Sequence, residues 1–327
     1  MAKKRIRIGL IGCGRNMTNA HVPRLLKDGA ADVVCVAEPF EPNVKLMFEK
    51  LGQEVPAYKD WRQMIREQSL DAVLISTPHD QHYDQTCECL KAGLHVLIEK
   101  PLTPSARQNQ ALIDMAARSG KILEVAYQRR FMPEYAFGRQ IIRDCRLGEL
   151  RGVVGYVTQA WFRAGGWRKD PVQAGGGMMM DTGSHLVAIM LWVTGLKAVE
   201  VSAIVDNCGD TVDLNSVVSI RFDNGAIGTL SFIGTAARHD ERLAIHGSEG
   251  CLVYQQHQWK LESTLLNGEP ARIPAKFKDS SPDAAFLQYI RTGGKGYEPP
   301  LFAVEVAKLT EAAYTSARTG GRPVPVA

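Results

Sequence analysis

Asp181 and His185 stand four positions apart in a segment whose residue types could carry out acid–base chemistry. The segment follows the run Gly175–Gly177 and is apolar enough to predict a helix that continues to Gly195. Residues four apart share one face of a helix, and a carboxylate beside an imidazole holds its tautomer and stabilises the imidazolium. The pair therefore predicts a general base that removes a hydroxyl proton. The alternatives are a surface ion pair or a hydrogen-bonded core histidine.

Lys100 is a second candidate for chemistry, because it follows the predicted strand 95–99 directly. In an open parallel sheet, ligands bind beyond the carboxyl ends of the strands. We therefore expect Lys100 to face a ligand, the alternative being an ordinary lysine of a surface loop. We expect no metal, since Asp181 and His185 supply two ligands and no third residue stands at a ligand-like spacing.

A glycine-containing turn, Gly12-x-Gly14, separates a predicted strand at 6–11 from a predicted helix at 18–26. The first glycine permits the tight turn, and the second lets a pyrophosphate approach the backbone beside the positive end of the helix. The third position of the G-x-G-x-x-G pattern is Met17, so its side chain must fit at the contact between helix and strand. A strand-to-helix turn that binds no ligand is the alternative interpretation.

Glu38 ends the next predicted strand, at the position where dinucleotide-binding proteins carry an acidic residue. A carboxylate there accepts hydrogen bonds from the ribose hydroxyls of the adenosine half. The residues that follow are Pro39, Phe40 and Glu41, so no adjacent basic side chain meets a 2′-phosphate. The sequence therefore favours NAD over NADP.

The elements that must position these residues change in pattern near residue 125. Before it, short apolar strands alternate with helices, which predicts a doubly wound parallel sheet, a Rossmann domain over 1–125. After it, short strands and tight turns predict an α+β domain over 126–327 with a large, open, mostly antiparallel sheet and a last helix at 302–317. One free face on so wide a sheet favours a homodimer or homotetramer.

Composition excludes several classes of protein. The chain has 327 residues, of which 45% are hydrophobic and 23% charged, which excludes disordered and fibrous classes and suffices for two domains. A net charge of +4 from scattered basic residues does not indicate a nucleic-acid partner. Neither a membrane span nor a secretory signal is predicted. The seven dispersed cysteines are typical of a reducing compartment, so we expect a cytoplasmic protein.

Four segments together resemble the glucose–fructose oxidoreductase, inositol dehydrogenase and rhizopine-catabolism family (Gfo/Idh/MocA). They are IGLIGCGRNMTNAHVPRL at 8–25, ISTPHDQHYDQTCECLKAGLHVLIEKPL at 75–102, YQRRFMPEY at 127–135 and GGGMMMDTGSHLVAIMLWVTG at 175–195. The resemblance covers nearly the whole chain. It implies hydride transfer between NAD(H) or NADP(H) and a sugar, cyclitol or small carbonyl compound.

The resemblance also implies a role for each matching residue. Lys100 matches the lysine of the family's E-K-P motif, and Asp181 and His185 match its D-x-G-x-H segment. His185 would then be the acid/base, Asp181 its partner and Lys100 a polar anchor for the reacting hydroxyl. Cofactor-binding residues would be Gly12, Gly14, Asn16, Met17, Glu38, Thr77, His82, Glu99 and Lys100. The substrate pocket would be lined by Arg130, Trp167 and Arg168.

Ala188 departs from the family pattern, because many members carry a second aspartate there. This departure bears on the polarity of the substrate pocket. Three functions stay open at this point. The first is a dehydrogenase or reductase. The second is a hydrolase or lyase that uses tightly held NAD for transient oxidation and therefore gives no net NADH. The third is an NAD-sensing protein without turnover.

Overall fold

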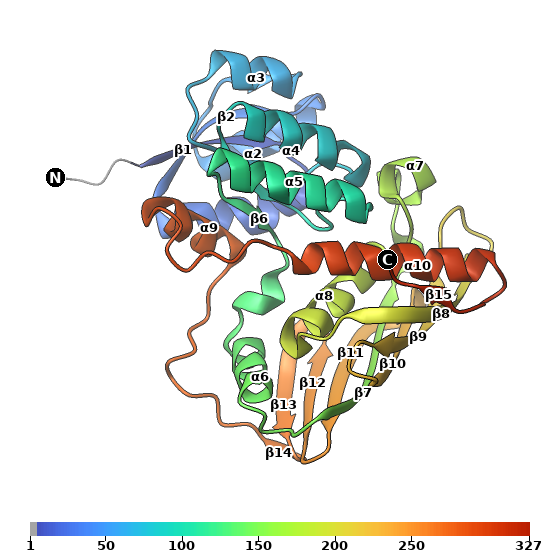
Figure 1. Cartoon of the computed structure of the whole chain (residues 1–327). Coiled ribbons are helices and arrows are strands. Elements are labelled where there is room, and N and C mark those ends of the chain that lie inside the picture. Colours follow the sequence, from blue (N-terminus) through green and yellow to red (C-terminus); the bar gives the residue numbers. More distant parts are fainter. Residues whose placement is uncertain (1–4) are drawn as a thin grey trace. The chain divides into compact units, whose positions relative to one another are not determined.

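The structure is a computed structural model that describes residues 5–327, and the chain divides into two compact units (Figure 1). The first unit contains the residues up to Thr103, with Arg107–Ala126 and Ser280–Leu301. The second contains Pro104–Ala106, Tyr127–Asp279 and Phe302–Ala327.

The first unit is built on a six-stranded parallel sheet in the order β3-β2-β1-β4-β5-β6. Its strands are β1 (Ile6–Ile11), β2 (Ala31–Ala37), β3 (Ala57–Tyr58), β4 (Ala72–Ile75), β5 (His95–Ile98) and β6 (Leu123–Val125). This is the order of a doubly wound dinucleotide-binding domain, as predicted. The order reverses between β1 and β4, so the glycine turn that follows β1 lies at the point where such sheets bind ligands.

Helices cover both faces of this sheet, which is why strands such as β4 are buried along their whole length. The helices are α1 (Val22–Asp28), α2 (Glu41–Leu51), α3 (Trp61–Glu67), α4 (His82–Lys91), α5 (Ala106–Ser119) and α9 (Pro282–Arg291). The helix predicted at 18–26 begins instead as a π-helical turn, η1 (Met17–His21), which continues into α1. Met17, at the third position of the glycine pattern, is fully buried in the core of this unit.

The helix α9 corrects the predicted domain assignment. The pattern of strands and turns predicts that all of 126–327 belongs to the second domain, but Ser280–Leu301 belongs to the first unit. The reason is hydrophobic burial: Phe286 and Leu287 of α9 join the apolar core beneath the parallel sheet. In Figure 1, α9 lies beside β6 although the two are far apart in the sequence.

The second unit is built on a nine-stranded sheet in the order β14-β13-β12-β11-β7-β10-β9-β8-β15. Its strands are β7 (Leu150–Ala160), β8 (Ala198–Asp206), β9 (Asn215–Phe222), β10 (Ile227–Ile233), β11 (Thr235–Gly247), β12 (Cys251–His257), β13 (Lys260–Leu266), β14 (Glu269–Pro270) and β15 (Val324–Pro325). All pairs are antiparallel except β7 with β10. The prediction of a large, mostly antiparallel sheet is confirmed.

The second unit contains four α-helices among the described residues, and its sheet leaves some apolar side chains exposed. The helices are α6 (Pro133–Arg143), α7 (Pro171–Ala174), α8 (Gly183–Thr194) and α10 (Phe302–Arg318). The helix α8 packs against β7, β11, α6 and α10, which is why it is apolar on all sides. Val153 is buried, whereas its neighbour Val154, with Val217 and Ile227, is exposed. Over residues 5–327, no helix has the length and apolar character that a membrane crossing requires.

Candidate active site

The two glycines of the turn after β1 play different parts in the first unit. Gly12 has φ +81°, and a Cβ there would lie 2.5 Å from the Ser76 carbonyl oxygen, so the fold itself requires glycine. A Cβ at Gly14 would have no neighbour within 4 Å. The space beside Gly14 is therefore open to a ligand, and a pyrophosphate fits the chemistry of this turn.

Glu38 is fastened to the same turn. Its Oε2 accepts a 2.8 Å hydrogen bond from the Cys13 N–H, and its Oε1 accepts a 2.9 Å bond from the Phe40 N–H. The carboxylate is thereby oriented, and each oxygen keeps a second lone pair for a ribose hydroxyl. Burial, with Glu38 nearby, raises the pKa of the Cys13 thiol to about 12, so Cys13 is a small buried residue rather than a reactive one.

His82 ties together the loops that follow β4 and β5. Its Nδ1 lies 2.8 Å from the Pro101 carbonyl oxygen and its Nε2 lies 3.1 Å from the Thr77 carbonyl oxygen. Burial lowers the pKa of His82, so the ring is neutral and donates to one of the two carbonyls. The Thr77 hydroxyl donates a 2.7 Å bond to Gln85 Oε1. These contacts hold the two loops at the ligand-binding edge of the sheet.

Three predicted residues, Asn16, Glu99 and Lys100, meet at the end of β5. Glu99 Oε1 accepts from Asn16 Nδ2 at 2.5 Å and from His21 Nε2 at 2.8 Å, and Glu99 Oε2 accepts from the Lys100 N–H at 3.1 Å. Burial alone would raise the pKa of Glu99, but the bonds and charge of His21 outweigh burial and lower it. Glu99 is thus an ionised carboxylate at this edge.

In the second unit, Asp181 precedes the helix on which it was expected. The helix α8 begins at Gly183, and residues before it form a series of turns. Asp181 Oδ2 accepts a 3.2 Å bond from Trp161 Nε1 and a 3.0 Å bond from Arg168 Nε. The Arg168 guanidinium also lies 4.5 Å from the centre of the Trp167 ring. Three predicted site residues, Asp181, Trp167 and Arg168, are therefore brought together.

The turns before α8 are anchored on Asp213. Its Oδ1 accepts from the Gly177 N–H at 2.6 Å and its Oδ2 accepts from the Met179 N–H at 2.9 Å. A Cβ on Gly177 would lie 2.0 Å from the Asp213 carbonyl oxygen, so this close approach requires glycine. These bonds fix the backbone of the turns, and the helix starts at Gly183, later than predicted.

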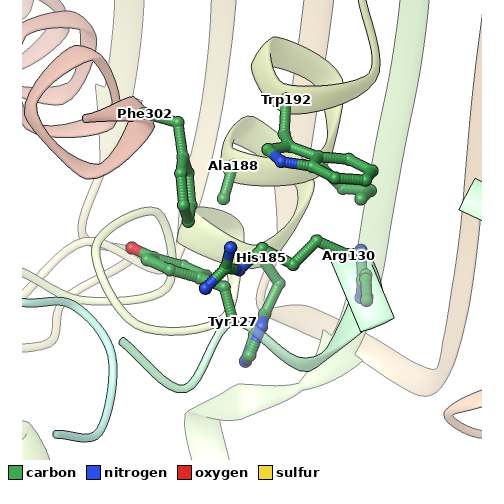
Figure 2. A pocket seen from close by; sticks show the side chains of 8 residues that line it. Tyr127, Arg130, His185, Ala188, Trp192 and Phe302 are labelled. Atoms are coloured by element: carbon green, nitrogen blue, oxygen red, sulfur yellow. The ribbon is translucent and has the colours of Figure 1, made fainter. Parts of the chain in front are cut away.

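His185 lies on α8 and borders a small cavity. The cavity is lined by one face of α8 and by the segment from Tyr127 to Arg130, together with the first residue of α10; Figure 2 shows Tyr127, Arg130, His185, Ala188, Trp192 and Phe302 around it. The Tyr127 ring stands edge-on to the His185 ring, with centroids 6.0 Å apart. Arg130, predicted to line the pocket, lies 5.3 Å from the centre of the Phe302 ring.

Most of this wall of the cavity is apolar. Ala188, Ile189 and Trp192 follow His185 at helical spacing, and Ala188 is 3% exposed. Arg129 also lines the cavity, but its guanidinium makes two bonds to the Glu241 carboxylate, one of 2.7 Å. Glu241 raises the pKa of Arg129 against the effect of burial. The departure at Ala188 therefore leaves an apolar surface one turn from His185.

Several residues of these sites are not predicted from the sequence. His21 and Asp283 support Glu99, Trp161 supports Asp181, and Tyr127 and Phe302 line the cavity. Ile189 and Trp192 also line the cavity, and their spacing of four and seven residues from His185 was a usable signal. Asp283 carried no signal, because it reaches His21 only through tertiary packing. Among residues 5–327, no group of three or more His, Cys, Asp or Glu side chains could hold a metal ion.

Two family models match the two parts of the chain. One is described as an oxidoreductase family with an NAD-binding Rossmann fold and matches residues 6–127. The other is described as the GFO/IDH/MocA C-terminal domain and matches residues 135–253.

Individual relatives agree with these models. The rhizopine catabolism protein MocA of Rhizobium meliloti is 32% identical over 191 residues, which span 58% of each chain. The myo-inositol 2-dehydrogenase of Thermotoga maritima is 28% identical over 75% of this chain and 74% of its own. The crystal structure of the WlbA dehydrogenase of Bordetella pertussis, in complex with NADH and UDP-GlcNAcA, superposes with a TM-score of 0.84 at 22% identity over 99% of each chain. Because models of one family match both the Rossmann domain and the sheet domain, this chain belongs to the Gfo/Idh/MocA family of NAD-binding oxidoreductases.

Proposed function

We propose that this protein transfers a hydride between the nicotinamide of NAD and a CH–OH carbon of a sugar, cyclitol or related polyhydroxylated compound. The observation that carries the proposal is His185 at the border of a cavity, in a chain whose family is one of NAD-binding oxidoreductases. Two relatives are named as inositol 2-dehydrogenases, which supports a small polyhydroxylated substrate.

The proposed reactive residues are Lys100, Asp181 and His185. In the oxidation direction, the His185 imidazole takes the hydroxyl proton, and Lys100 donates a hydrogen bond to the same oxygen as negative charge develops there. Asp181, oriented by Trp161 and Arg168, supplies the negative charge that favours the His185 imidazolium. NAD⁺, held by the cofactor residues of the first unit, would supply the hydride acceptor.

Cofactor binding is assigned to the turn after β1 and to the ends of β2, β4 and β5. Gly14 admits the pyrophosphate, and Asn16, Met17, Thr77, His82 and Glu99 shape the crevice around it. Glu38 accepts the ribose hydroxyls and repels a 2′-phosphate, so we propose NAD rather than NADP. Titrations of the protein with NAD⁺ and NADP⁺ test this point, and equal affinities contradict it.

We also propose a cytoplasmic homodimer or homotetramer. Support for the assembly comes from exposed apolar side chains on the sheet of the second unit, such as Val154, Val217 and Ile227. Support for a reducing compartment comes from the cysteines, all seven of which carry free thiols. Light scattering coupled to gel filtration measures the assembly directly.

The hydrolase or lyase alternative has no support among the relatives described above, which are named as dehydrogenases or as a catabolic protein of the same family. The NAD-sensing alternative differs in predicting no turnover with any substrate.

The deciding experiment is a spectrophotometric screen of sugars, cyclitols and sugar acids with NAD⁺ or NADP⁺. Formation of NADH with one substrate class supports the proposal. If no compound in the panel gives NADH or NADPH, and NAD is released from the denatured protein, the result contradicts the proposal and favours an internal redox cycle.

A further inference from the structure

A buried histidine links two carboxylates in the first unit, and the proposed reaction does not use it. His21 Nε2 lies 2.8 Å from Glu99 Oε1, and His21 Nδ1 lies 2.7 Å from Asp283 Oδ1. The side chains of His21 and Asp283 are each 1% exposed, and that of Glu99 is 13% exposed. The hydrogen-bonded side chains of Asp283, His21 and Glu99 thus run from the interior to the ligand-binding edge of the sheet.

The charges of these three side chains follow from their hydrogen bonds. A carboxylate accepts hydrogen bonds and does not donate them, so both ring nitrogens of His21 must carry protons and the ring is an imidazolium. Although burial acts to lower it, the pKa of His21 is raised to about 9, chiefly by Asp283 and then by Glu99. The other charged neighbours are Arg24, 3.3 Å from Asp283 Oδ2, and Lys100, whose charge acts on Glu99.

His21 therefore determines both the charge and the position of Glu99. One Glu99 oxygen is held between His21 and Asn16, and the other accepts from the Lys100 N–H. Removal of the imidazolium charge leaves a carboxylate that is largely buried and short of a cation, which favours its protonated form. Asn16 and Lys100 would then lose the ionised acceptor that now orders them.

We propose that His21 and Asp283 are positioning residues that hold Glu99 as a fixed anion in the cofactor crevice, and that this anion makes the protein favour NAD⁺ over NADH. The inference rests on the proposed binding of NAD. The nicotinamide ring carries a positive charge in NAD⁺ and none in NADH, so a fixed carboxylate at this edge attracts only the oxidised form. A partly buried negative charge that acts over several ångströms should raise the affinity for NAD⁺ roughly tenfold.

The test compares dissociation constants for NAD⁺ and NADH in the wild type and in His21→Asn, measured calorimetrically between about pH 6 and 8. We expect His21→Asn to weaken NAD⁺ binding about tenfold while NADH binding changes less than about twofold. We also expect NAD⁺ affinity in the variant to fall as the pH is lowered, because Glu99 then takes up a proton. In the wild type the NAD⁺/NADH ratio stays constant over this range.

Two further variants keep the test decisive if His21→Asn does not fold. Glu99→Gln removes the anion itself, so it should lose NAD⁺ affinity to a similar extent with no dependence on pH. Asp283→Asn keeps the imidazole but removes its buried partner, so a smaller shift in the same direction is expected. The matched control is His95→Asn, at the opposite end of β5, where His95 Nδ1 accepts from the Ile122 N–H at 2.9 Å; its NAD⁺/NADH ratio should equal that of the wild type.

Equal losses of NAD⁺ and NADH affinity in these variants, without a change in pH dependence, overturn the inference and leave His21 a purely structural residue. A wild-type protein that binds neither form overturns the proposed function as well, so the two failures are distinguishable.

Discussion

The Tyr314 hydroxyl donates a 2.6 Å hydrogen bond to Asp213 Oδ1, which connects α10 to the turn that precedes the proposed acid/base residue. The same carboxylate accepts hydrogen bonds from the backbone N–H groups of Gly177 and Met179. Asp213 is 3% exposed. Burial, and after it the charge of Asp213, raises the pKa of Tyr314 well above its usual value, so the phenol stays protonated and donates. The entry to α8 therefore depends on a residue distant in sequence from both Asp181 and His185.

Substitutions at this anchor should reduce activity without touching a reactive residue. Tyr314→Phe removes one donor, and we expect a loss of about 1 kcal/mol in unfolding free energy. Asp213→Ala leaves two backbone N–H groups without their acceptor, and we expect a loss of about 3 kcal/mol together with at least a tenfold fall in kcat. Urea denaturation and steady-state kinetics measure the two effects. An Asp213→Ala variant as stable and active as the wild type contradicts the anchoring role.

The two glycines of the nucleotide turn should respond differently to alanine. Gly12→Ala places a Cβ at 2.5 Å from a backbone oxygen at φ +81°, so we expect a destabilised or unfolded protein. Gly14→Ala meets nothing within 4 Å, so its melting temperature should stay close to that of the wild type. Its NAD⁺ affinity should nevertheless fall by about tenfold or more, because the methyl group occupies the approach of the pyrophosphate. Unchanged NAD⁺ binding by Gly14→Ala would contradict the assignment of the pyrophosphate to this turn.

Local patterns account for what the sequence predicted correctly. Continuous apolar strands between helices predict the parallel sheet. Strands with alternating apolar and polar residues, joined by tight turns, predict the antiparallel one. The motifs around Gly12, Lys100 and His185 identified the family because each combines a residue type with a defined position next to a strand or helix.

Tertiary contacts account for what the sequence did not show. The assignment of α9 was missed because its apolar residues, Phe286 and Leu287, look the same whichever core they join. The start of α8 was misplaced because Asp213, which is distant in sequence, binds the backbone of the residues before the helix and holds them in turns. Asp283 was missed because only the folded chain brings it to His21.

The stability of the first unit should depend on pH through His21. Its pKa in the folded protein is about 9, above the ordinary value of 6.5, so its contribution is fully present below about pH 6.5 and is lost as the pH rises through 9. The difference in unfolding free energy between the wild type and His21→Asn should shrink by on the order of 3 kcal/mol over this interval. Denaturation series at several pH values measure the trend. A difference that stays constant, or grows with pH, contradicts a charged His21.

The buried ion pair of the second unit should tolerate loss of both partners better than loss of one. Glu241→Gln leaves the Arg129 guanidinium buried without its counter-charge, and we expect a cost of about 3–5 kcal/mol. The double variant Arg129→Met with Glu241→Leu removes both charges and should recover most of that loss. Urea midpoints of the three proteins decide the matter. A double variant less stable than Glu241→Gln would show that the pair itself stabilises the fold.

Replacement of His185 should separate chemistry from cofactor binding. His185→Ala removes the proposed acid/base, so we expect kcat to fall by about 10²–10⁴. NAD⁺ affinity should stay near that of the wild type, because the residues assigned to the cofactor lie in the first unit and His185 lies in the second. The control is His246→Ala, which removes an exposed histidine of β11 in the same unit and should leave kcat unchanged. Since a general base acts in its neutral form, the wild type should also lose activity at low pH, whereas the residual activity of His185→Ala should lack that acid limb. An unaltered kcat in His185→Ala would show that another group accepts the proton.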